Sequence, residues 1–205
     1  MHATEGSARP LGSTSYDPLM VPEAPLEQTD NGVVAAGDGW FVLNARDARW
    51  HHADGRGARL TLDGETEFPQ VGVVLYVLAP GEPMGMYHWE SNQEDFLVLS
   101  GEALLLIEGE ERPLRAWDFV HCPPDTKHII IGAGDRPCAV LGIGAREEQE
   151  GKEWGGYSVE EVALRYGVGV ERETSDAEEA YAHLPGREPT RYREGWLPAA
   201  RDTRT

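Results

Sequence analysis

Four side chains of types that bind divalent metals lie in two segments of an otherwise apolar part of the sequence. His88 and Glu90 come first, Glu94 follows after a short polar turn, and His128 opens a later apolar run. In a strand, residues i and i+2 point to the same face, so His88 and Glu90 can both point inward. Imidazole nitrogens and carboxylate oxygens suit a divalent transition metal that keeps positions open for substrate. The pattern therefore predicts a metal site.

The segments around these residues are typical of short β-strands separated by glycine and proline turns. Strands are expected near residues 40–43, 59–62, 71–79, 88–90, 95–99, 103–107, 112–114, 118–121, 128–131 and 138–143. Many short strands of this kind favour a sandwich or barrel over alternating strands and helices. We therefore expect an all-β fold, closed as a jelly-roll barrel, that carries the candidate metal ligands on its inner face.

Two motifs in residues 70–145 resemble those of the cupin superfamily. His88, Glu94 and Gly101 fall at the spacing of the first cupin motif, and Pro123 and His128 match the second. The resemblance implies a double-stranded β-helix, a divalent metal inside the barrel and a homodimer. It also implies that His88, Glu94 and His128 form a face of two histidines and one carboxylate.

The sequence departs from the cupin motifs at several positions. Glu90 stands where a second histidine is usual, while Trp117 and Asp125 stand where glycines are usual. Three roles are open for Glu90: a fourth metal ligand, a catalytic base beside the metal, or a replacement that leaves the site without metal. We take a fourth metal ligand as the leading hypothesis for Glu90 and a catalytic base as the second. An oxygen-rich ligand set favours one Mn or Fe ion per chain, with Zn or Ni possible.

Other histidines and the two cysteines are expected to have structural roles. His121 is expected on the outer face or at a subunit interface, and His51 and His52 in an exposed polar loop. Cys122 and Cys138 are too few and too isolated to suggest a disulfide scaffold, so we expect both to be reduced and unpaired.

The chain divides into three parts by composition. Residues 1–30 are rich in Pro, Gly, Ser and Thr and predict an extended arm; residues 31–146 form the barrel; residues 147–205 form a C-terminal helical segment and tail. Capping boxes that begin at Ser158 and at Ser175 predict two short helices, and Gly167 ends the first of them.

Composition narrows the classes of function. The 205 residues carry a net charge of −18, which argues against nucleic acids and anionic membranes as partners. No apolar run approaches the ~20 residues that span a bilayer, and we expect a cytoplasmic protein. The leading hypothesis is a metalloenzyme, dioxygenase- or isomerase-like, that acts on a small oxygen-rich molecule. The alternative is a non-catalytic cupin that binds or senses a small ligand.

Overall fold

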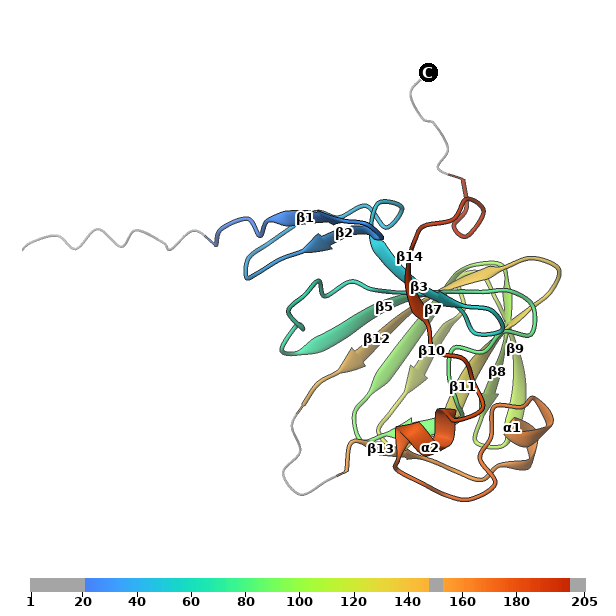
Figure 1. The fold of residues 1–205 in the computed structure, drawn as a ribbon. Coiled ribbons are helices and arrows are strands. Elements are labelled where there is room, and N and C mark those ends of the chain that lie inside the picture. The colour runs from blue at the N-terminus through green and yellow to red at the C-terminus, as the bar shows by residue number, and fades with distance from the viewer. Residues whose placement is uncertain (1–20, 148–152, 200–205) are drawn as a thin grey trace, which may run out of the picture.

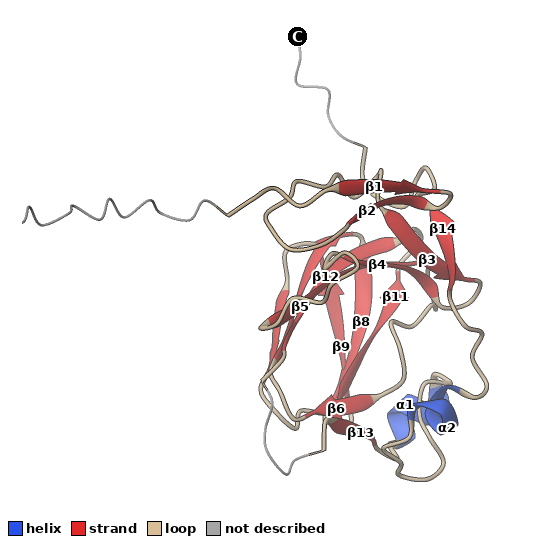
Figure 2. Ribbon diagram, turned by 60° about the vertical axis from the view of Figure 1, so that its left-hand side comes forward, coloured by secondary structure: helices blue, strands red, loops and turns tan. Residues whose placement is uncertain are grey.

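The computed structural model describes residues 21–147 and 153–199, and it is built almost entirely from antiparallel β-sheets (Figures 1 and 2). The seven-stranded sheet has the order β10 (Phe119–Cys122), β7 (Glu94–Ser100), β12 (Cys138–Ala145), β5 (Val71–Leu78), β4 (Gly57–Thr61), β3 (Arg49–Ala53), β14 (Glu188–Arg191). The five-stranded sheet has the order β13 (Gly155–Tyr157), β6 (His88–Glu90), β11 (His128–Ala133), β8 (Glu102–Ile107), β9 (Glu110–Arg115). A separate hairpin joins β1 (Leu26–Thr29) to β2 (Gly32–Ala35). The predicted all-β jelly roll is confirmed.

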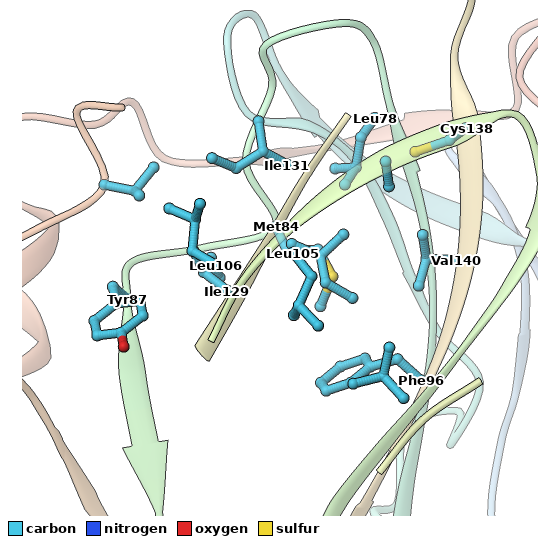
Figure 3. Close-up of a cluster of buried hydrophobic side chains, with 14 of the residues drawn as sticks. Leu78, Met84, Tyr87, Phe96, Leu105, Leu106, Ile129, Ile131, Cys138 and Val140 are labelled. Atoms are coloured by element: carbon cyan, nitrogen blue, oxygen red, sulfur yellow. The ribbon is translucent and has the colours of Figure 1, made fainter. Parts of the chain in front are cut away.

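The main hydrophobic core lies between the two large sheets. Figure 3 shows Leu105 and Ile129 of the five-stranded sheet close to Phe96 and Val140 of the seven-stranded sheet, and all four are buried in one cluster. In β7 the alternate residues Phe96 and Val98 are buried, as the period of two requires for a strand with one face on the core. The core therefore fixes which face of β7 points into the barrel.

The opposite face of the seven-stranded sheet is also covered. Trp50, Leu60 and Leu75 form a second buried cluster, against which Trp196 and Leu197 of the C-terminal segment pack. A sheet that is buried on both faces needs apolar residues on successive positions, which explains the nearly unbroken apolar sequence of β5.

The expected strands of the barrel are present, with differences at the two ends of the chain. Residues 40–43 do not form a strand, since only Trp40 makes an isolated bridge. His51 and His52 lie on β3 and not in a loop. The β1–β2 hairpin crosses the expected boundary at residue 30, and residues 1–20 lie outside the described part. The C-terminal segment supplies β13 and β14 as well as helices, because each adds to the edge of a sheet.

Two positions where cupin motifs usually have glycine adopt the backbone conformation that favours glycine. Trp117 has φ 77° and Asp125 has φ 69°. The Trp117 amide donates a hydrogen bond to the Val98 carbonyl (2.7 Å), and the Asp125 amide donates one to the Glu90 carbonyl (2.8 Å). Both turns therefore adopt the conformation that glycine takes most easily, at the strain that a side chain meets at positive φ.

The two helices are short: α1 spans Glu161–Arg165 and α2 spans Ala177–Tyr181. Each begins later than its expected capping box, since Glu160 and Asp176 are the N-caps in place of Ser158 and Ser175. Ser158 is buried, and the acidic side chain nearer each helix accepts the free amide hydrogens. In the described ranges, no helix is long and apolar enough to cross a membrane.

Candidate metal centre

Strand pairing brings two histidines and one glutamate together inside the barrel. β11 pairs with β6 so that His128 lies directly opposite His88. Glu94, at the start of β7 in the other sheet, has its Oε2 atom 3.7 Å from His88 Nε2 and 3.4 Å from His128 Nε2. One donor atom from each of the three residues lies within 4.8 Å of the others. Because metal–ligand bonds are about 2.0–2.2 Å long, donor atoms at these separations can share one ion.

Backbone carbonyls orient both imidazole rings. His88 Nδ1 lies 2.8 Å from the Met86 carbonyl oxygen, and His128 Nδ1 lies 3.0 Å from that of Thr126. A carbonyl oxygen only accepts hydrogen bonds, so each Nδ1 carries the proton and donates. Each Nε2 is then left with a lone pair that faces Glu94. This is the arrangement in which a neutral histidine binds a metal.

Two of the three donor atoms have no hydrogen-bond partner. Glu94 Oε2 and His128 Nε2 are buried and unpaired within the described residues. An unsatisfied buried polar group costs about 1–3 kcal/mol, and more when it is charged, so such atoms are rare without a reason. A divalent cation between them would satisfy both. The residues present therefore fit a metal.

Burial shifts the pKa values of the site toward neutral side chains. Burial, and then the neighbouring His128, lower the pKa of His88 to about 4, while burial raises the pKa of Glu94 to about 8, with Glu90 adding to the effect. Burial also lowers the pKa of His128 and raises that of Glu90. A divalent cation would reverse the shift of the carboxylates, because it favours their charged form.

Glu90 lies beside this group of three and not within it. Its Oε1 atom is 3.8 Å from His88 Nε2, so the side chain shares the inward face of β6, as strand alternation predicts. Its side chain is 30% exposed, compared with 14% for Glu94. Glu90 is therefore on the solvent side of the site. Its role as ligand or as base remains a prediction.

The other histidines considered from the sequence lie outside this group. His121 is about half exposed on β10, where its Nδ1 atom lies 2.7 Å from Asp95 Oδ1, in agreement with the expected outer-face position. His51 and His52 lie on β3, four strands from β7 in the sheet order. Cys122 and Cys138 are free and buried, which confirms that they do not pair with each other.

Two aromatic rings lie beside the imidazoles, and the sequence pattern indicates only one of them. Phe96 packs on His128 with ring centroids 5.2 Å apart, and Tyr157 lies 6.2 Å from His88. Phe96 follows from strand alternation on β7. Tyr157 comes from β13, a strand of only three residues that shows no periodic signal in the sequence.

Comparison with solved structures gives distant similarities. A proposed sugar phosphate isomerase from Acidithiobacillus ferrooxidans is 28% identical, with 48% of this chain and 68% of that chain covered and a TM-score of 0.43. A cupin protein from Bacteroides fragilis is 29% identical, with 47% and 84% covered and a TM-score of 0.41. A cupin 2 domain-containing protein from Halorhodospira halophila is 21% identical, with 48% and 70% covered and a TM-score of 0.42. No curated protein matches the chain.

The family model gives the assignment. The model of the cupin domain matches residues 74–144, the part of the chain that runs from β5 to β12 and holds all the candidate metal ligands. The motif spacing, the antiparallel barrel and the positive φ angles at both substituted glycine positions agree with this match. The protein thus contains a cupin domain at residues 74–144.

Proposed function

We propose that the protein is a metal-dependent enzyme that acts on a small oxygen-rich molecule. The observation that carries the proposal is the pair of buried, unpartnered atoms, Glu94 Oε2 and His128 Nε2, that face each other at 3.4 Å. Only a cation or a proton satisfies both at once, and three donor atoms within 4.8 Å favour the cation. His88, Glu94 and His128 are the proposed ligands of one Mn or Fe ion.

The chemistry that we propose is proton transfer on a bound substrate, as in an isomerase. When bound, a divalent metal supplies Lewis-acid polarisation of substrate oxygen atoms. His88 and His128 present their Nε2 atoms, fixed by their Nδ1 hydrogen bonds, so that the site does not need to rearrange on binding. The aromatic rings of Phe96 and Tyr157 lie against His128 and His88 and give the site an apolar side.

Glu90 is the proposed catalytic base. It is half-buried on the solvent side of the site, 3.8 Å from His88 Nε2, where an incoming substrate meets it before the other groups. Burial raises its pKa, which makes it a better proton acceptor than an exposed carboxylate. This position favours the base over the fourth-ligand role, and a base at the site is what proton transfer requires.

Metal analysis tests the first part of the proposal. After reconstitution with Mn²⁺ and removal of excess, we expect about one ion per chain in the wild type and in His121→Gln, which changes an exposed histidine. We expect His128→Gln to lose the ion, because it removes a buried ligand. Equal metal content in the two variants would contradict the assignment.

An exchange experiment tests the second part. The Mn²⁺-loaded protein is incubated in D₂O with a panel of hydroxy acids, oxo acids and sugar phosphates, and deuterium on carbon is followed by NMR. We expect incorporation into one class by the wild type and none by Glu90→Gln, which retains its metal. Oxygen uptake without deuterium incorporation would instead support a dioxygenase. Binding without either reaction would support the non-catalytic alternative.

We also propose that the protein is a cytoplasmic homodimer. Phe119, the first residue of the edge strand β10, is 63% exposed, and Trp117, two residues before it, is 73% exposed. Exposed aromatic residues next to an open strand edge are typical of a surface that a partner covers. The free cysteines agree with a reducing compartment. Sedimentation velocity tests the dimer, and a monomer at all concentrations would contradict it.

A further inference from the structure

A second cavity lies on the barrel side of the seven-stranded sheet. It has a volume of about 320 Å³ and is lined by His51, Arg56, Arg59, Thr61 and Arg187. This volume is at the lower end of the range for small-molecule sites. The composition of the lining is unusual for this chain, which carries 36 acidic and only 18 basic residues. Three arginines therefore line one cavity of a strongly acidic protein.

Within the described ranges, the three arginines have no acidic partner at ion-pair distance. Among the ion pairs of the described residues, none joins Arg56, Arg59 or Arg187 to a carboxylate within 4.0 Å. Arg187 donates to the carbonyls of Gly57 and Met84, which satisfies hydrogen bonds but leaves its charge uncompensated. The buried Nε of Arg56 has no hydrogen-bond partner. Burial and the nearby charge of Arg56 lower the pKa of Arg187 to about 10.

Strand register places the cavity on the same face as the metal centre. Arg59 lies opposite Tyr76, Tyr76 lies opposite Val140, and Val140 lies opposite Val98. Residues that are directly opposite in an antiparallel sheet point to the same face. Glu94 lies four residues before Val98 on β7 and therefore shares that face. From β4 to β7 there are three strand spacings, or about 14 Å along the sheet.

Aromatic contacts connect the cavity to a candidate metal ligand. The guanidinium carbon of Arg56 lies 4.7 Å from the centroid of the Tyr181 ring. Tyr181 packs edge-on against Tyr157 at 5.8 Å, and Tyr157 lies 6.2 Å from His88. The Tyr181 hydroxyl also accepts a hydrogen bond from the Met86 amide, which fixes it at the base of the His88 strand. A series of ring contacts therefore runs from Arg56 in the cavity to His88 in the metal centre.

We propose that the arginine cavity binds an oxyanion, a carboxylate or a phosphate, carried by the molecule whose other oxygen atoms reach the metal centre. A guanidinium group binds either oxyanion through two parallel hydrogen bonds, and uncompensated arginines are set up for this task. Oxyanion binding itself needs no metal. The placement of the rest of the molecule at His88, Glu94 and His128 rests on the proposed function.

Anion titration tests the cavity directly. Inorganic phosphate and acetate are titrated separately into the metal-free, full-length protein, and the ring-proton resonances of His51 report on the cavity by NMR. Arg59→Gln is the test variant, because Arg59 is exposed and its side chain bonds only to Thr61 among the described contacts. Arg112→Gln, an exposed arginine on β9, is the matched control for the change in charge.

We expect saturable binding of at least one anion to the wild type and to Arg112→Gln. Binding to Arg59→Gln should be about ten- to a hundredfold weaker, as expected for the loss of a charge-assisted hydrogen bond. Tighter phosphate binding would identify a phosphate-bearing ligand, and tighter acetate binding a carboxylate. The proposal is overturned if neither anion shifts His51 at tens of millimolar, or if Arg59→Gln binds as tightly as the wild type.

Mn²⁺ binding separates this inference from the proposed function. Arg59→Gln should keep its Mn²⁺ ion, and Glu94→Gln should lose Mn²⁺ while it still binds the anion. A protein that binds the anion at the arginines but takes up no Mn²⁺ would keep this inference and contradict the metalloenzyme. A protein that binds Mn²⁺ but no anion would contradict this inference and leave the proposed metal site in place.

Discussion

Metal binding should be linked to the release of one proton from Glu94. Burial holds the pKa of Glu94 at about 8, so below that pH the metal-free side chain is mostly protonated and a metal must displace its proton. His88 has a pKa of about 4 and is already neutral above pH 5, so it releases none. At pH 6 only about 1% of Glu94 is ionised, which weakens Mn²⁺ binding about a hundredfold relative to its limit at high pH.

Calorimetry of Mn²⁺ binding at several pH values measures this linkage. Between pH 6 and pH 7 the affinity should rise about tenfold, and titrations in two buffers of different ionisation enthalpy should show about one proton released per ion. Glu90 also has a raised pKa and can add to the release in the wild type, so the count of about one proton applies to Glu90→Gln, in which Glu94 titrates without it. An affinity that is independent of pH from 6 to 7.5 would refute the reasoning.

Three further outcomes follow from the structure. Between pH 6.5 and pH 8 the metal-free protein should lose roughly 2 kcal/mol of stability, because the folded pKa of Glu94 lies above its unfolded value; thermal melts should show the loss, and Glu94→Gln should remove it. Trp117→Gly should raise stability by about 0.5–1 kcal/mol by relief of its positive φ, whereas Trp117→Ala, which keeps the strain, should not. Phe119→Arg should shift a dimer to monomer in sedimentation velocity without a change in the melting temperature of the monomer.

The barrel and the three-residue group could be predicted from the sequence because both depend on local patterns. Apolar runs between glycine and proline turns gave the strands from β4 to β12, and alternation gave the inward face of His88. The motif spacing then placed His128 and Glu94 without knowledge of the pairing. These signals are short-range, and each is repeated in several neighbouring strands.

The elements at the two ends of the chain could not be predicted in the same way. β13 and β14 are short and become strands only because a sheet edge is available to them. β3 carries two histidines and an arginine, so its sequence lacks the apolar pattern of a strand. Only the burial of Trp50 in the second cluster explains why it pairs into the sheet. The arginine cavity combines residues from β3, β4, the turn between these strands and the segment just before β14, so it exists only in the folded chain.

The most direct test of the metal centre is a crystal structure of the protein grown or soaked with Mn²⁺, with anomalous data collected near the Mn absorption edge. We expect one strong anomalous peak per chain, about 2.0–2.3 Å from His88 Nε2, His128 Nε2 and Glu94 Oε2. A fully soaked crystal with no peak among these three atoms, or with its main peak at another site, would contradict the account.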